Sequence, residues 1–383
     1  MKRVIIRNVL ILVVTLFLSI LLVYSSNIYF FSSKNHVSSD MDTTIPKETR
    51  LSLVMVGDSL IHGAVYSDAY HNGKYDFYSM LSEMKPIISS YDLAFYNQES
   101  ILGGSELGLS SYPRFNSPYE VGDAFIDAGF NLVSLANNHT LDRGEQAILN
   151  STSYWKTKDV YVSGSYSSME DRNKIVVKEK NGIKYALLSY TCWTNGLSIP
   201  DGKTYLLNRY DSEIVKKDIE SVRDRVDLLM VSMHFGEEYS FTPTSEQKKI
   251  ASYLASLGVD IVIGHHPHVV EPIEFIDNTL VIYSLGNFIS GQRGIEKLTG
   301  LMVSVDVIKK NNGDTVLDNV SSELTYTYSD NQKGYRGNFK VYPYSKLTES
   351  LLPNYKTYYN KYMDIAIHGD SRIGKSDYSG NSK

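Results

Sequence analysis

Side chains that bind metal ions or move protons follow five short apolar runs of this sequence, at the point where each run ends. Carboxylate, amide and imidazole groups in such a mixture suit Mn, Zn or Fe better than Ca. The sequence therefore predicts a divalent-metal site. The segments are Gly57-Asp58, Asn97-Gln98-Glu99, Asn137-Asn138-His139 with Asp142 and Gly144, His234-Phe235-Gly236-Glu237-Glu238, and Gly264-His265-His266-Pro267-His268.

Each of these segments, taken alone, also has a purely structural explanation. Gly57-Asp58 after a strand is typical of a turn in which the aspartate side chain bonds the backbone. His234 fits a buried, hydrogen-bonded histidine, and Asn138 fits a loop amide that caps a following helix. The segment from His265 to His268 is stronger evidence, because three imidazoles within four residues rarely serve packing. In open α/β sheets, sites form at the carboxyl ends of strands, so the segments together favour a metal site.

The apolar runs themselves indicate the strands that would position these residues, because they are short and bounded by Gly, Asn or Asp. A helix is expected over Ser245–Leu257, with a capping box of Thr244 and Gln247 and a stop at Gly258. Hairpins are expected at Asn181-Gly182 and around 311–314. The mixture predicts a layered α/β sandwich with parallel and antiparallel strands. The expected strands are Leu51–Val56, Leu93–Tyr96, Leu132–Leu135, Tyr185–Tyr190, Leu228–Met233, Ile261–Ile263, Leu280–Tyr283, Leu301–Ile308 and Val316–Thr325.

The N-terminal segment predicts a membrane anchor. Lys2, Arg3 and Arg7 precede an apolar run from Val9 to Tyr24. A helix from Ile5 to Tyr24 reaches the ~20 residues that are needed to cross a bilayer. The positive charges should stay in the cytoplasm, which sends the rest of the chain outward. An uncleaved anchor is favoured over a cleaved signal peptide, because no small-residue cleavage site follows and Tyr29 begins an aromatic interfacial belt.

Composition and patterning divide the 383 residues into four parts. We expect a cytoplasmic stub and transmembrane anchor over 1–25, a linker over 26–50, one large domain over 51–345, and a polar tail over 346–383 that is disordered from Ser371 onward. The net charge of −5 argues against a nucleic-acid binder. The single cysteine, Cys192, excludes an intramolecular disulfide framework and a cysteine-rich zinc site.

The ordered series of motifs between Leu51 and Phe288 resembles the signature of the CapA (PgsA) family. Proteins of that family are associated with poly-γ-glutamate capsule synthesis, and their domain resembles the calcineurin-like metallophosphoesterases. The motifs are Asp58, Asn97-x-Glu99, Asn137-Asn138-His139-x-x-Asp142-x-Gly144, His234-x-Gly236-x-Glu238, Gly264-His265-x-Pro267-His268 and Tyr283-Ser284-Leu285-Gly286-Asn287-Phe288.

The resemblance implies a four-layer α/β/β/α sandwich with two metal ions, preceded here by the transmembrane helix. It also implies that His139 lies beside the ions and protonates a leaving oxygen or steadies a phosphoryl oxygen. Two neighbouring ions can clamp a phosphoryl group and activate a hydroxide for in-line attack. The implied ligands are Asp58 and His268 for one ion, Asn138, His234 and His265 for the other, and Glu99 in the bridging position.

Two features depart from the phosphoesterase pattern. That pattern usually begins with Asp-x-His, but Asp58 is followed by Ser59 and Leu60. His62 either reaches back as a substitute or is a solvent-exposed loop histidine. The bridging carboxylate is Glu99 instead of an aspartate and reaches one methylene further, so one ion is expected to bind weakly or not at all.

Several further residues are expected close to the site. Glu238 and Asp142 are expected to orient imidazoles. Asn287 either faces the mouth of the site or forms a turn after its strand. His266 stands at a position that the family pattern leaves free, so it is not among the predicted ligands.

Three functions remain open from the sequence. The first is assembly of an anionic capsule polymer outside the membrane, beside a polymer synthase complex, with metal ions or a basic patch holding the polymer. The second is an extracellular metal-dependent phosphoesterase or related hydrolase. The third is a surface domain whose metal only stabilises the fold.

Overall fold

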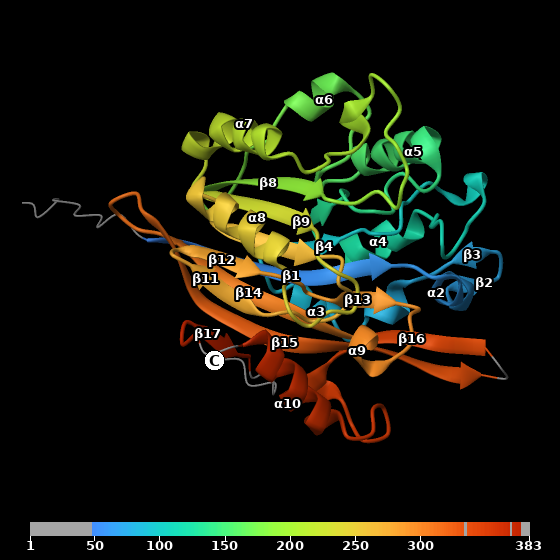
Figure 1. Ribbon diagram of the computed structural model, residues 1–383. Helices are drawn as coiled ribbons and strands as arrows, with labels where there is room; N and C mark the ends of the chain where they lie inside the picture. Colours follow the sequence, from blue (N-terminus) through green and yellow to red (C-terminus); the bar gives the residue numbers. More distant parts are fainter. Residues whose placement is uncertain (1–47, 333–334, 368–369, 377–383) are drawn as a thin grey trace, which may run out of the picture. The chain divides into compact units, whose positions relative to one another are not determined.

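The computed structural model describes residues 48–332, 335–367 and 370–376, and two large sheets run through this part of the chain (Figure 1). In the larger sheet, β1, β4, β5, β6 and β13 pair in parallel, whereas β14, β15 and β16 pair antiparallel. Its order is β16 (Tyr335–Pro343), β15 (Thr315–Gln332), β14 (Thr299–Lys309), β1 (Thr49–Leu60), β4 (Leu93–Asn97), β5 (Leu132–Ser134) and β6 (Tyr161–Ser163), with β13 (Asn287–Ser290) beside β1 and β17 (Ile373–Lys375) beside β15.

The second sheet also mixes parallel and antiparallel pairs, which confirms the predicted mixed α/β architecture. Its order is β11 (Ile273–Ile276), β12 (Thr279–Ile282), β10 (Ile261–His265), β9 (Leu228–His234), β8 (Ile183–Thr191) and β7 (Lys178–Lys180), and a small ribbon joins β2 (Tyr70–His71) and β3 (Lys74–Tyr75). The helices are α2 (Gly63–Asp68), α3 (Lys85–Ile88), α4 (Glu120–Asp127), α5 (Gly144–Lys156), α6 (Met169–Asn173), α7 (Ser212–Val222), α8 (Ser245–Ser256), α9 (Ile295–Leu298) and α10 (Tyr355–Ala366).

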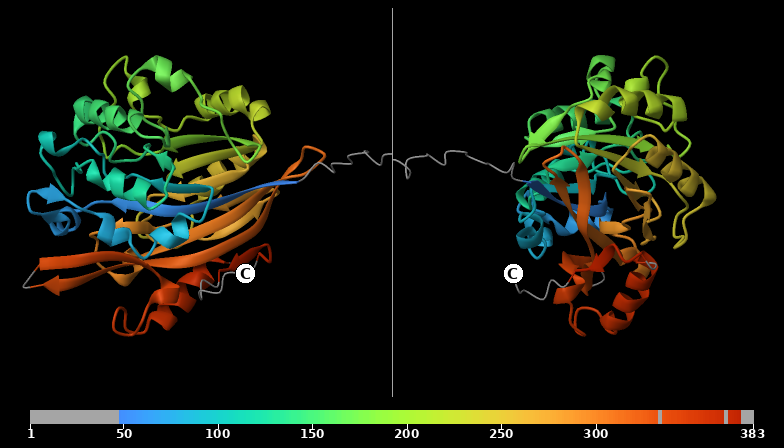
Figure 2. Two further views of the ribbon diagram at one scale, coloured as in Figure 1. Left: turned by 180° about the vertical axis from the view of Figure 1, so that it is seen from behind. Right: turned by 90° about the vertical axis from the view of Figure 1, so that its left-hand side faces the viewer.

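The layers follow from the alternation of side chains along each strand. On β1, Leu53 faces a core between the two sheets, whereas Val54 faces a second core that is shared with α3 and α4. On β8, Leu187 enters the core between the sheets, and Leu188 enters a third core with α7 and α8. The two sheets therefore pack face to face, and helices cover their outer faces (Figure 2).

The local structures expected from turn and capping residues are confirmed. Asn181 and Gly182 adopt φ values of 53° and 76° and join β7 to β8, as a two-residue hairpin turn requires. Residues 311–314 lie in the hairpin between β14 and β15. Helix α8 begins with the capping box of Thr244 and Gln247.

The chain beyond residue 346 differs from the predicted polar tail. Helix α10 buries Tyr362 and Met363 in the core between the sheets, and β17 pairs with β15, so Ser371 does not begin a disordered end. The helix was missed because tyrosines form much of its buried face, and few aliphatic residues mark it. The end of the predicted tail, residues 377–383, lies outside the part of the chain that the structure describes.

The predicted N-terminal anchor, residues 1–25, and nearly all of the predicted linker also lie outside the described residues. Among the helices from residue 48 onward, none is both long enough and apolar enough to cross a membrane.

A buried carboxyl group, Glu271, ties the segment after β10 to the first turn of α8. Its Oε2 accepts a hydrogen bond of 2.7 Å from Nε2 of Gln247, but its Oε1 has no hydrogen-bond partner. Burial raises the pKa of Glu271 to about 8, although the Gln247 hydrogen bond opposes this shift. Between its ordinary pKa of 4.5 and about 8, the folded chain therefore holds a proton that the unfolded chain releases, so stability falls as the pH rises through this window.

We expect Glu271→Gln to remove this loss of stability. The variant should match the parent near pH 5 and exceed its free energy of unfolding by about 1–3 kcal/mol above pH 8, the cost of a poorly partnered buried charge. Urea unfolding from pH 5 to pH 9 measures both curves. Glu220→Gln, on the exposed face of α7, is the control and should follow the parent. Parallel curves for parent and Glu271→Gln would contradict the expectation.

Candidate metal centre

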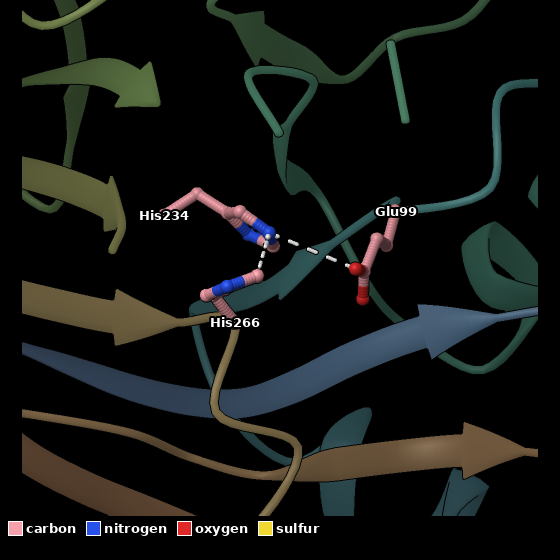
Figure 3. A group of neighbouring side chains, drawn as sticks. All are labelled: Glu99, His234 and His266. Atoms are coloured by element: carbon pink, nitrogen blue, oxygen red, sulfur yellow. Dashed lines mark hydrogen bonds and ion pairs between the residues drawn. The ribbon is translucent and has the colours of Figure 1, made fainter. Parts of the chain in front are cut away.

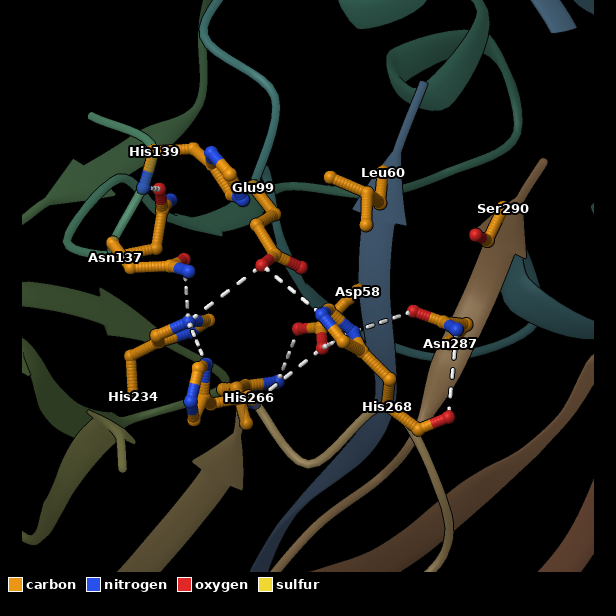
Figure 4. A network of polar contacts seen from close by, with 12 residues as sticks. Asp58, Leu60, Glu99, Asn137, His139, His234, His266, His268, Asn287 and Ser290 are labelled. Atoms are coloured by element: carbon orange, nitrogen blue, oxygen red, sulfur yellow. Dashed lines mark hydrogen bonds and ion pairs between the residues drawn. The ribbon is translucent and has the colours of Figure 1, made fainter. Parts of the chain in front are cut away.

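The predicted ligands meet where strands of both sheets end (Figure 4). Asp58 lies near the end of β1, and Glu99 and Asn138 lie in the loops that follow β4 and β5. These three come from the larger sheet. The other sheet contributes His234, the last residue of β9, and the segment that begins with His265 at the end of β10. All of these side chains are buried.

One potential metal-binding group consists of Asp58, Glu99 and His268, whose ligand atoms lie within 4.8 Å of one another. Nδ1 of His268 is 3.4 Å from Oδ2 of Asp58, and Nε2 of His268 is 3.6 Å from Oε1 of Glu99. The Asp58 carboxylate is fixed by a 2.8 Å hydrogen bond from Nδ2 of Asn97 to its Oδ1. The predicted pairing of Asp58 with His268 is thus present in the geometry.

The second group consists of Glu99, His234 and His266 (Figure 3). Three atoms surround Nε2 of His234: Oδ1 of Asn138 at 2.9 Å, Nδ1 of His266 at 3.2 Å and Oε1 of Glu99 at 3.6 Å. At most one hydrogen can sit on that nitrogen, so it can satisfy only one of these neighbours. Several lone pairs therefore converge on one point, as they do around a bound cation.

Glu99 gives the clearest test of whether a metal fits. It is fully buried and belongs to both groups, yet neither carboxylate oxygen has a hydrogen-bond partner. A buried carboxylate without such partners is costly unless a cation or metal ion pairs with it. Together with imidazole, carboxylate and amide donors, this makes the residues a good fit for divalent ions.

Burial and neighbouring charges set the protonation of these groups. Burial raises the pKa of Glu99 well above its ordinary value. Burial would do the same to Asp58, but its contacts with the imidazoles of His265 and His268 outweigh burial and hold its pKa well below the ordinary value. Burial lowers the pKa of His234 strongly and that of His266 to about 3. Both imidazoles therefore stay neutral and keep a lone pair for a metal.

The histidine segment is where the structure departs from the predicted ligand set. His265 belongs to neither group; its Nδ1 lies 3.1 Å from Oδ1 of Asp58, and its ring lies against Phe95. His266, which was left out of the prediction, takes its place beside His234. The cause is the backbone, because φ is 101° at His266 and 58° at His268, so the alternation of a strand ends at His265.

His139 lies beside the two groups and is held by Asp142. Its Nδ1 is 2.7 Å from Oδ2 of Asp142, which also accepts a hydrogen bond from the Phe115 N–H. The imidazole packs edge-on against the Phe115 ring, with 4.7 Å between ring centroids. Asp142 therefore makes the contact expected of a group that orients an imidazole, whereas Glu238 is exposed and its hydrogen bond is to Tyr239.

His62 and Asn287 had two explanations each from the sequence. His62 fits neither of these explanations. It is half-buried against Phe115, and its Nδ1 lies 3.1 Å from the carbonyl oxygen of Leu60 and 3.2 Å from the amide nitrogen of Gly291. Burial lowers the pKa of His62 to about 4. Asn287 faces the site, with its Oδ1 3.0 Å from Nδ1 of His268.

Two solved structures resemble the chain weakly. The NAD nucleotidase of Haemophilus influenzae is 14% identical at a TM-score of 0.44, over 86% of this chain and 65% of that one. A hypothetical protein from Thermus thermophilus is 15% identical at a TM-score of 0.45, over 72% of this chain and 98% of that one. Similarity of this size assigns no activity to the chain.

Curated relatives are closer in sequence. The PGA biosynthesis protein CapA of Bacillus subtilis is 30% identical over 49% of this chain and 50% of its own length. The capsule biosynthesis protein CapA of Bacillus anthracis is also 30% identical, over 52% of this chain and 49% of its own length. The chain thus spans about half the length of these relatives. The family model of the bacterial capsule synthesis protein PGA_cap matches residues 52–292, which include every residue of both groups, so the chain belongs to this family.

Proposed function

We propose that this chain takes part in the synthesis, assembly or export of a capsule polymer outside the cell membrane, and that it uses a divalent-metal centre to do so. Membership of the capsule synthesis family supports the process. The observation that carries the metal centre is Glu99, a fully buried carboxylate that two histidine-containing groups share and that no hydrogen bond satisfies.

The location is part of the proposal and rests on the sequence. Lys2, Arg3 and Arg7 before the apolar run from Val9 to Tyr24 favour a single-pass anchor with a cytoplasmic N-terminus. The domain would then face outward beside a polymer synthase complex in the same membrane. Two ions, from Mn, Zn or Fe, would lie in the two groups, with Glu99 between them.

Some residues of the centre would bind metal ions, and His139 would transfer protons. Asp58, Glu99 and His268 would hold one ion, and Glu99, His234 and His266 with Asn138 the other. Bound divalent ions supply Lewis acidity and positive charge for acidic or phosphoryl oxygens. His139 keeps its Nδ1 on Asp142, which leaves Nε2 to donate a proton to a substrate oxygen or to accept one from it.

The second candidate function is an extracellular metal-dependent phosphoesterase or related hydrolase. The observation that favours it is the pair of His139 and Asp142, because a histidine fixed by a buried carboxylate suits proton transfer to a leaving oxygen. A protein that only holds a polymer would not need this pair.

Complementation tests the proposal and separates the two functions. In a strain that lacks this chain, the parent sequence should restore surface polymer, whereas a chain with His234→Ala and His268→Ala should not. Protease added to intact cells should digest the domain if it faces outward. Normal polymer in the deletion strain would contradict the proposal. Metal-dependent release of phosphate from p-nitrophenyl phosphate by the full chain would then support the hydrolase.

Asp142→Asn should separate proton transfer from metal binding. The variant keeps the shape of the side chain but loses the charge that fixes the His139 ring, so we expect metal content to stay and function to fall about 10- to 100-fold. His139→Ala should keep the metal and lose function as well. Metal analysis of purified protein and the complementation assay measure both properties. A loss of metal in either variant would mean that the pair supports the ligands instead.

A further inference from the structure

A guanidinium without a carboxylate partner lies beside the metal centre. Arg336 donates from Nη1 to the carbonyl oxygens of Gly291 (2.6 Å) and Gln292 (2.9 Å), and from Nε and Nη2 to Oγ of Ser329. Its guanidinium also lies over the Phe339 ring. Among the described residues, no carboxylate comes within ion-pair distance of it. A half-buried positive charge held only by neutral groups leaves a negative charge to be supplied from elsewhere.

A second arginine adds to this unbalanced charge. Arg293 is exposed and follows the two residues whose carbonyl groups Arg336 holds. No described acid pairs with Arg293. Burial lowers the pKa of Arg336, and the positive charge of Arg293 lowers it further. Two neighbouring guanidinium groups repel each other unless an anion lies close to both, and guanidinium is the group that best matches carboxylate and phosphate.

Hydrogen bonds connect this pair to a predicted metal ligand. Nδ1 of His268 meets Oδ1 of Asn287, and Nδ2 of Asn287 donates to Oε1 of Gln292 over 2.9 Å. Gln292 in turn is held by Arg336 through its carbonyl oxygen. The arginines therefore lie beyond the end of β13, on the side of Ser290, which Figure 4 shows across Asp58 from His266.

Acidic side chains lie beside His266, at another part of the centre. A cavity of about 490 Å³ adjoins His266 there and is lined by Trp193 and three glutamates. No described cation forms an ion pair with these carboxylates, so they repel an acidic ligand. The glutamates are Glu237, Glu238 and Glu246.

We propose that Arg293 and Arg336 form an anion-binding subsite that takes an acidic group of the substrate next to the group held at the metal centre. The inference rests on the proposed function and narrows its substrate class to a chain with repeated acidic groups. Such a chain would leave the metal centre toward the arginines, because the glutamates around the cavity beside His266 repel it there. Carboxylate and phosphate groups share the chemistry that the subsite recognises.

Charge reversal at Arg293 tests the subsite without disturbing the fold, because this side chain is exposed. The full chain in detergent, loaded with Mn, is titrated with two fluorescent probes, a γ-linked glutamate decamer and a polyphosphate of ten units. Arg293→Glu is compared with Arg225→Glu, which makes the same charge change just before β9, at the end of the sheet away from His234. Metal content is measured in each protein.

We expect Arg293→Glu to keep its metal and to bind the glutamate decamer at least about tenfold more weakly, the size of one lost charged contact. Arg225→Glu should bind within about twofold of the parent. If Arg293→Glu weakened the binding of polyphosphate but not of the glutamate decamer, the anion-binding subsite would be supported. The assignment of a glutamate-like polymer to the proposed function would then be wrong. Equal affinities for Arg293→Glu and Arg225→Glu with both probes would overturn the subsite, whichever polymer binds.

Discussion

A chain that carries both His234→Ala and His268→Ala is expected to lose its divalent metal. Each substitution removes an imidazole from one group, and Asp58, Glu99 and His266, which remain, complete neither group. Loss of residues that only orient ligands typically weakens metal affinity 10- to 100-fold, so loss of two ligands should exceed about 100-fold.

Metal content after exposure to Mn, Zn or Fe and exhaustive dialysis measures this effect directly. His71→Ala is a suitable control, because His71 is an exposed histidine in β2 and belongs to neither group. The control should keep the metal content of the parent. Unchanged metal content in the double variant would show that the ions, if bound, lie elsewhere. Loss of one ion and retention of another in the single variants would assign each histidine to its own group.

Glu99→Gln is expected to stabilise the metal-free chain while it weakens metal binding. Burial raises the pKa of Glu99, so its charged form destabilises the folded state more and more as the pH rises above the ordinary value of 4.5. The neutral amide removes this penalty. We expect a gain of about 1–3 kcal/mol in the free energy of unfolding near pH 8, and no gain near pH 4.

Urea unfolding with and without chelator measures both effects of this substitution. With chelator, Glu99→Gln should unfold at a higher urea concentration than the parent. With Mn present the order should reverse, because both groups lose the carboxylate that they share. A variant that is less stable than the parent in chelator would contradict this account, since the His268 imidazole, whose Nε2 lies 3.6 Å from Oε1 of Glu99, would then stabilise the carboxylate enough to offset its burial.

Much of the fold and most of the site follow from the sequence by local rules. Short apolar runs predict the strands, because a strand buried on both faces needs no polar residue until it ends. Asp58, Glu99 and His234 are therefore visible as polar residues at strand ends. Turn residues such as Asn181 and Gly182 predict hairpins equally well, because few other residues adopt the positive φ that these turns require.

The remaining features depend on tertiary structure that one sequence does not specify. His266, and not His265, lies beside His234 because the backbone adopts a positive φ at His266 and His268, after β10. No residue type in this segment predicts that backbone conformation. Helix α10 is not predicted by the sequence, because a tyrosine such as Tyr362 has both an apolar ring and a polar hydroxyl. Whether such a side chain is buried depends on what packs against it. The contact between His62 and Phe115 likewise needs two loops far apart in the sequence.

The division of the ligands between the two sheets has a consequence for the lifetime of the protein. Asp58 and Glu99 lie in or just after strands of one sheet, and His234 and His266 lie in or just after strands of the other. An ion bound by these residues would therefore hold the two sheets together until it dissociates. A ligand at 100 times its dissociation constant adds about 2.7 kcal/mol to stability. We therefore expect the lifetime of this protein to track the local supply of metal, because a chain deprived of it opens more often to proteases.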